Sequence, residues 1–171
     1  MTKFHTIILF LFCLISCKSN NEKNIQPIRP GKNDLVDLNK YLVQKDRERI
    51  LNYIERKNLE MTESSTGLWY RIKQEGTGKF LTDKDHILME YDCSLIDGTK
   101  CYSSKTAGPK EIILGRSQLE PGLNEGLRML KEGAEATFIL PPFLAFGLIG
   151  DGKKIPSRAV IVYNVNILHA K

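Results

Sequence analysis

The chain has 171 residues, of which 42% are hydrophobic and 26% are charged, and its formal net charge is +5. This length suits one compact domain with a flanking segment, and the composition is that of a soluble globular domain that needs neither disulfides nor a structural metal. The basic residues are spread along the chain without a block that alternates with aromatic residues, so the charge does not favour a nucleic-acid partner.

The first 16 residues have the pattern of a bacterial signal peptide. A short basic start is followed by an apolar run from Thr6 to Ile15, which is shorter than the ~20 apolar residues of a transmembrane helix. The run ends in Leu14-Ile15-Ser16-Cys17, which resembles the lipobox of bacterial lipoproteins. The resemblance implies cleavage before Cys17 and a lipid on its sulfur, and two or three acyl chains form a stable membrane anchor. The alternative is an ordinary signal peptide that ends at a cysteine.

Residues 17–33 are predicted to form a flexible tether, because they are mostly polar and include Pro27, Pro30 and Gly31. Lys18, which follows the lipobox cysteine, resembles the second residue of lipoproteins that are released to the outer membrane. We therefore expect a lipid-anchored protein of the cell envelope, on the outer membrane and facing the periplasm.

A helical segment is expected over residues 34–60. Leu35, Leu38 and Leu42 recur at helical spacing, as do Val43, Ile50 and Ile54 further along. One helix or two short helices over residues 34–57 fit this pattern. The apolar stripe either packs on the following domain or pairs with a partner chain, as in a homodimer through this helix, and the sequence leaves both open.

From Thr66 the pattern changes to strands and turns, and the compact domain is expected over residues 66–171. Strands are predicted at residues 67–75, 87–96, 98–103, 110–114, 134–140 and 159–168. A short helix is predicted at residues 121–130, where Pro121 suits a helix N-terminus. Residues 141–158 form a long loop rich in glycine and proline, which on a compact domain is usually functional. These elements predict an α+β fold.

Cys93 and Cys101 flank Asp97-Gly98, which is a strong hairpin turn signal. If those two residues form the loop, Cys93 faces Tyr102 across the hairpin. Strict alternation then places the two cysteines on opposite faces of the sheet. A disulfide stays open in an oxidising compartment, but this placement argues against it.

Residues 67–171 contain an ordered series of motifs. They are Gly67 to Tyr70, Gly76-Thr77-Gly78, Tyr91 to Gly98, Tyr102-Ser103-Ser104, Leu114-Gly115, Leu119 to Leu127, Met129 to Gly133, Pro142, Ala145-Phe146-Gly147, Ile155-Pro156 and Val160 to Val165. Their order and spacing resemble the FKBP-type peptidyl-prolyl cis–trans isomerases. The segment from Ile50 to Ile54, together with the lipobox, also resembles the gliding-motility-associated lipoproteins of this family in the Bacteroidetes.

The resemblance implies a curved antiparallel sheet wrapped around one short helix, with a pocket between them under the long loop. It implies no metal, cofactor or covalent intermediate. The implied catalytic positions are Tyr91, Tyr102, Phe146 and Tyr163. The implied substrate-binding positions are Cys101, Leu119, Glu120, Leu123 and Ile155, and Glu120 acts through its backbone N–H. For each apolar residue taken alone, an ordinary core position is the alternative.

Five residues depart from the family's pattern. Tyr102 stands where the family has a pocket aspartate, and Cys101 stands where it has a phenylalanine. Phe146 lacks the hydroxyl of the usual tyrosine, Glu120 replaces an isoleucine or valine, and Lys154 replaces an aliphatic residue. These exchanges remove an acceptor and a donor from the pocket and add charge at its rim.

The implied activity is the acceleration of X–Pro bond rotation in exported polypeptides by desolvation in an apolar pocket. The alternative is a catalytically weak FKBP-fold binding module or chaperone in an envelope machine for gliding or secretion. A hydrolase or metalloenzyme is not favoured, because His5, His86 and His169 lack ligand spacing. Ser103 and Ser104 have no histidine partner that the sequence identifies, and we expect them to form a turn.

Overall fold

The structure is a computed structural model that describes residues 31–171. The predicted signal peptide, the lipobox with Cys17 and residues 17–30 of the tether lie outside the described residues. The chain divides into Met1–Leu35 and the compact unit Val36–Lys171. Within residues 31–171, no helix combines the length and the apolar character that crossing a bilayer requires.

One continuous helix precedes the sheet. Helix α2 covers Lys32–Lys57, so it begins two residues before the position that the sequence predicted. The reason is local, because the Asp34 carboxylate accepts a hydrogen bond from the Gly31 N–H at 3.0 Å and caps the first turn.

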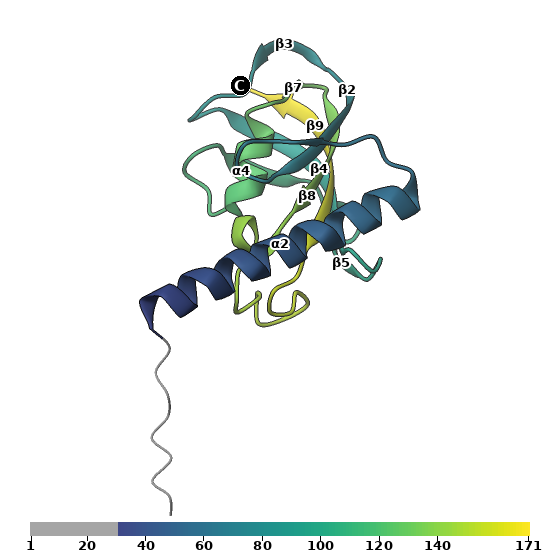
Figure 1. The fold of residues 1–171 in the computed structure, drawn as a ribbon. Helices are drawn as coiled ribbons and strands as arrows, with labels where there is room; N and C mark the ends of the chain where they lie inside the picture. The colour runs from purple at the N-terminus through teal and green to yellow at the C-terminus, as the bar shows by residue number, and fades with distance from the viewer. Residues whose placement is uncertain (1–30) are drawn as a thin grey trace, which may run out of the picture. The chain divides into compact units, whose positions relative to one another are not determined.

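The compact unit is built on an antiparallel sheet, shown in Figure 1. Its strands are β1 (Thr62–Glu63), β2 (Trp69–Gln74), β4 (His86–Leu95), β5 (Lys100–Ser103), β6 (Lys110–Ile113), β8 (Glu135–Leu140) and β9 (Ile161–Ala170). The strand order is β1-β2-β8-β9-β4-β5, and β6 pairs with the first half of β4. Strands β3 (Thr77–Phe80) and β7 (Lys131–Glu132) form a separate two-stranded ribbon. The remaining helices are α3 (Ser104–Ala107), α4 (Pro121–Leu127) and the short 3-10 helix η1 (Pro142–Leu144).

The predicted α+β fold is confirmed, and the long predicted strands correspond to β2, β4, β8 and β9. The sequence did not predict β1, β3, β7, α3 or η1. These elements are only two to four residues long, and so short a segment shows no hydrophobic period. The short helix α4 ends at Leu127, earlier than predicted.

The central strands bury side chains on both faces. Phe138 and Tyr163 are directly paired across β8 and β9, and they belong to the main core together with Leu123 and Leu127 of α4. Their neighbours Ile139 and Val162 are also paired, and they belong to a second core with Ile50 of α2 and Trp69 of β2. Helices α4 and α2 therefore pack on opposite faces of the sheet.

The predicted pairing of Cys93 with Tyr102 is confirmed, but the placement of the cysteines on opposite faces is wrong. The next pair in the hairpin is Ser94 with Lys100, because the register shifts by a bulge after Cys93. Cys101 therefore turns into the main core, where Cys93 also lies. Both residues are buried free thiols.

Candidate functional site

The aromatic positions singled out in the sequence converge on one pocket of about 320 Å³. It lies where β4, β5 and β9 meet the residue before α4 and the loop of residues 141–158, here called the pocket loop. Its lining residues are Tyr91, Tyr102, Lys110, Glu120, Phe146, Asp151, Lys153 and Tyr163.

Five of the nine predicted site residues line this pocket, namely Tyr91, Tyr102, Glu120, Phe146 and Tyr163. The others lie behind it in the main core: Cys101, Leu123 and Ile155 are buried there, and Leu119 packs partly buried against it. The structure thus brings the aromatic positions together in the pocket lining, whereas Cys101 and the aliphatic positions belong to the core against which the pocket is built.

Two tyrosine rings form the wall that is contributed by the sheet. The centroids of Tyr91 and Tyr163 are 6.3 Å apart and their planes are inclined by 49°, within the range of favourable tilted aromatic pairs. The Tyr163 hydroxyl donates a hydrogen bond to Glu120 Oε1 at 2.9 Å. Burial, with the nearby Glu120 carboxylate, raises the pKa of Tyr163 far above its ordinary value. Tyr163 therefore acts as a neutral donor that fixes the Glu120 side chain.

The family resemblance implied an aspartate at position 102, and Asp151 of the pocket loop supplies a carboxylate to the pocket instead. The Tyr102 hydroxyl donates a hydrogen bond to Asp151 Oδ2. Asp151 Oδ1 accepts the backbone N–H groups of Lys153 and Ile155, each at 2.8 Å. The Asp151 carboxylate thereby binds the hydroxyl of Tyr102, the residue that stands in place of the expected aspartate.

The pKa values of this pair follow from the same contacts. The hydrogen bond to Asp151 raises the pKa of Tyr102 to about 12. Burial alone would raise the pKa of Asp151, but the hydrogen bonds from Tyr102 and from the loop N–H groups outweigh it and lower that pKa. At neutral pH the pair is therefore a phenol that donates to a carboxylate.

Three lysines add positive charge at the rim. Lys110 and Lys153 line the pocket, and Lys154 Nζ lies 5.3 Å from the centroid of the Tyr102 ring, within range of a cation–π contact. Sequence reasoning noted Lys154 but missed Lys110, Asp151 and Lys153. Asp151-Gly152 is a turn signal in the sequence, but it does not indicate where the carboxylate points.

The conformation of the pocket loop places Asp151. The Gly150 N–H donates to Phe146 O at 3.2 Å, and the Asp151 N–H donates to Ile155 O at 3.0 Å. At the base of the loop, the Arg158 N–H donates to Gly147 O at 3.0 Å. These backbone bonds make the loop a closed unit whose position determines that of Asp151.

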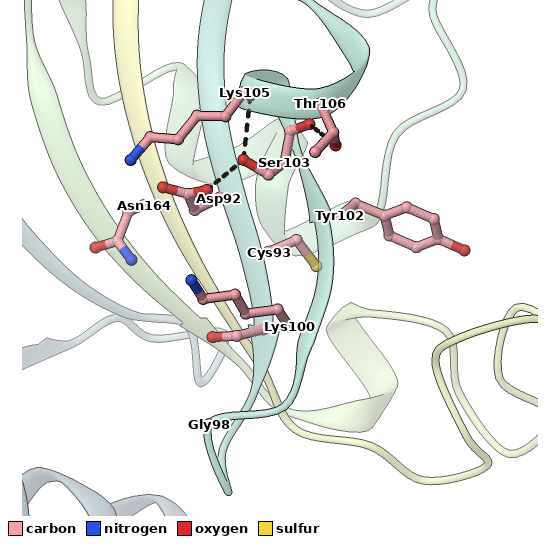
Figure 2. A pocket seen from close by; sticks show the side chains of 10 residues that line it. Asp92, Cys93, Gly98, Lys100, Tyr102, Ser103, Lys105, Thr106 and Asn164 are labelled. Atoms are coloured by element: carbon pink, nitrogen blue, oxygen red, sulfur yellow. Dashed lines mark hydrogen bonds between the residues drawn. The ribbon is translucent and has the colours of Figure 1, made fainter.

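A second pocket of about 440 Å³ lies beside the β4–β5 hairpin and is lined by charged and hydroxyl side chains as well as Cys93 and Tyr102. In Figure 2 the Tyr102 ring points away from Asp92 and Lys105. Ser103 Oγ donates to Asp92 Oδ1 at 2.5 Å and accepts the Lys105 N–H at 3.1 Å, which caps α3. Ser103 is the last residue of β5 and caps α3, and Ser104 is the first residue of that helix, so the predicted turn is wrong. Tyr91, Phe146 and Tyr163 do not line this pocket.

The aromatic pocket is suited to binding and desolvation. Burial raises the pKa of the nearby Cys93 thiol to about 12, so Cys93 stays protonated and is not a nucleophile at neutral pH. Among residues 31–171, no three His, Cys, Asp or Glu side chains gather in a way that could hold a metal ion. The groups that the pocket does offer are aromatic faces, two carboxylates and rim cations.

A family model described as FKBP-type peptidyl-prolyl cis-trans isomerase matches residues 77–168. A relative from Neisseria meningitidis, named a probable FKBP-type peptidyl-prolyl cis-trans isomerase FkpA, is 42% identical over 105 residues, which are 61% of this chain and 38% of the relative. A Chlamydia trachomatis relative, named peptidyl-prolyl cis-trans isomerase Mip, is 32% identical over 103 residues, or 60% of this chain and 41% of the relative. The chain therefore spans about two fifths of the length of these curated relatives.

Solved structures give the same likeness. The crystal structure of FkpA from Escherichia coli is similar with a TM-score of 0.65 and 27% identity, over 84% of this chain and 74% of that chain. The crystal structure of AtFKBP13 is similar with a TM-score of 0.61 and 25% identity, over 66% of this chain and 99% of that chain.

Proposed function

Because the chain belongs to the FKBP-type peptidyl-prolyl cis–trans isomerase family, we propose that it accelerates the rotation of X–Pro bonds in exported polypeptides. The observation that carries the proposal is the convergence of Tyr91, Phe146 and Tyr163 on one pocket from segments far apart in the chain. Aromatic faces of this kind offer a water-poor surface to a proline ring.

The chemistry requires only desolvation and fit. The barrier to rotation about a peptide bond is ~18–20 kcal/mol, because the C–N bond has partial double-bond character. Water hydrogen-bonds the carbonyl and favours that planar, polarised form. A pocket that excludes water, and that fits the twisted amide better than either planar isomer, lowers the barrier. Glu120 precedes α4 as its N-cap residue, so its backbone N–H lies outside the helix bonds and suits a peptide carbonyl.

A protease-coupled peptide assay on the complete chain tests this function. We expect acceleration over buffer, and a loss of most of it in Phe146→Ala, which removes a ring from the pocket. Phe143→Ala is the matched control, because Phe143 is 47% exposed and does not line the pocket. If the chain binds proline peptides but gives no acceleration, the isomerase proposal is wrong.

That outcome would favour the second candidate, a binding module for proline-containing segments in an envelope machine for gliding or secretion. The observation behind it is Glu120, whose carboxylate lies inside the pocket and is held there by Tyr163. A charge at this position opposes the entry of an apolar ring, because the carboxylate must lose its hydration when the ring binds.

We expect Glu120→Leu to raise kcat/KM by about three- to tenfold, which corresponds to ~1 kcal/mol of transition-state stabilisation. The physical reason is that an aliphatic side chain extends the apolar surface and frees the Tyr163 hydroxyl. Glu125→Gln is the control, since Glu125 lies on α4 but bonds Ser64 and Thr66 away from the pocket. A decrease in kcat/KM in Glu120→Leu would show that the carboxylate assists the reaction.

We propose a lipid anchor at Cys17, which would hold the domain on the outer membrane facing the periplasm, where exported polypeptides fold. The slow, unaided isomerisation of X–Pro bonds gives such a domain a reaction to accelerate. Pairing of two copies through α2 is the further expectation, and the exposure of Leu38, Tyr41 and Val43 on that helix supports it.

A further inference from the structure

We propose that Asp46 of α2 and Arg158 of the pocket loop form a clamp that positions the loop over the pocket and sets its affinity for peptide. The inference rests on the proposed function, because the regulated property is peptide binding at the same site. It makes the N-terminal helix a working part of the site, although α2 contributes no residue to the pocket lining.

The clamp is an ion pair between a buried carboxylate and a partly exposed guanidinium. Arg158 Nη2 donates to Asp46 Oδ2 at 2.6 Å, and the side chain of Asp46 is only 5% exposed. The same nitrogen lies 3.5 Å from Leu42 O, one turn earlier in α2. Arg49 adds a longer contact of 3.4 Å to Asp46 Oδ1. A buried carboxylate needs a partner, so displacement of Arg158 would leave Asp46 poorly compensated.

The backbone conformation of Arg158 would favour glycine, which indicates that the arginine is present for its side chain. Arg158 has a φ of +55°, a left-handed conformation in which glycine is favoured over residues with a Cβ. The backbone bond from Arg158 N–H to Gly147 O is one that a glycine could make equally well. What glycine could not supply is the guanidinium that bonds Asp46.

The clamp is connected to the pocket through the base of the loop. Arg158 closes the loop on Gly147, and Ser157 Oγ bonds Leu148 O at 2.5 Å. Between these ends lies Asp151, which accepts from Tyr102 in the pocket. A shift of the base therefore moves Asp151, and with it the Tyr102 side chain that lines the peptide-binding pocket.

The test compares Asp46→Asn and Arg158→Gly with the complete wild-type chain. Arg158→Gly keeps the left-handed backbone accessible, so it removes the clamp without adding strain. The matched control is Glu63→Gln, which converts another carboxylate that accepts from an α2 arginine, Arg47, at 2.7 Å. Glu63 lies on β1 and does not line the aromatic pocket.

We expect both clamp variants to raise KM, and the Kd for a proline peptide, by about tenfold with a smaller change in kcat. Amide hydrogen exchange should become faster at Lys153 and Ile155, whose N–H groups bond Asp151. Exchange in β4 and β9 should stay slow, and Glu63→Gln should change none of these values. The double variant should be no worse than either single variant, because the two residues act as one unit.

Unchanged exchange at Lys153 and Ile155, or an equal effect of Glu63→Gln, would overturn the clamp. So would a fall in kcat at constant KM. The two proposals fail separately. A wild-type chain without isomerase activity refutes the proposed function, whereas the exchange rates and the peptide Kd still decide whether the clamp positions the loop.

Discussion

Replacing Gly150 with alanine is expected to lower kcat/KM for X–Pro rotation by about 100-fold while the sheet and its core stay folded. Gly150 has a φ of +79°, and a Cβ there would lie 2.3 Å from Ile155 O and 2.7 Å from Pro156 C. These are backbone atoms that cannot rotate away, so the loop itself must shift. The shift carries Asp151, the next residue, away from Tyr102.

Gly152→Ala is the matched control for this substitution. Gly152 also has a positive φ, of +70°, but a Cβ there meets no atom within 4 Å. Its cost should be limited to ~1–2 kcal/mol for the left-handed conformation, with the pocket in place. The peptide assay and a thermal melt of both variants separate the two effects. Equal losses of activity in both variants would show that backbone strain, and not the clash with residues 155 and 156, is responsible.

Phe138→Ala is expected to lower the free energy of unfolding by ~3–5 kcal/mol, the usual cost of deleting a buried phenyl ring. Phe138 lies on β8 with none of its surface exposed. A Cβ at Gly126 of α4 would lie only 2.7 Å from the Phe138 ring. The ring therefore fills the space between sheet and helix, and no neighbouring side chain can collapse fully into the cavity it leaves. Urea unfolding followed by circular dichroism measures the loss.

Phe80→Ala provides the comparison, because it deletes the same ring at a site that is 53% exposed on β3. Lys131 Nζ lies 4.8 Å from the centroid of this ring, so we expect a loss of no more than ~1 kcal/mol. If Phe80→Ala were as destabilising as Phe138→Ala, the core between β8 and α4 would not be the main source of stability.

The two cysteines show where reasoning from the sequence was sufficient and where it failed. The turn signal at Asp97-Gly98 correctly indicated a hairpin and the pairing of Cys93 with Tyr102. Alternation then placed Cys101 on the wrong face, because the bulge after Cys93 changes the side to which the following residues point. The loop is also one residue longer than the assumed two, because the Leu95 N–H donates to Thr99 O at 2.9 Å and closes a loop of residues 96–98.

The pocket residues also divide into those that the sequence predicted and those that it did not. Tyr91, Phe146 and Tyr163 were predicted to meet because their motifs keep the order and spacing of a known family, and they do line one pocket. Whether each contributes to catalysis stays a prediction. Asp151 could not be predicted in the same way, because its role depends on a loop that returns to a tyrosine 49 residues earlier in the chain.

Sequence periodicity was enough to predict the α+β fold and the long strands, and the fixed order of the motifs was enough to predict which aromatic residues line the pocket. Two features became visible only in the folded chain: α2 is continuous with its Asp46 buried against Arg158, and the pocket loop supplies a carboxylate to Tyr102. The physical reason is that ion pairs and hydrogen bonds between distant segments depend on how those segments pack, whereas helix and strand periods are local.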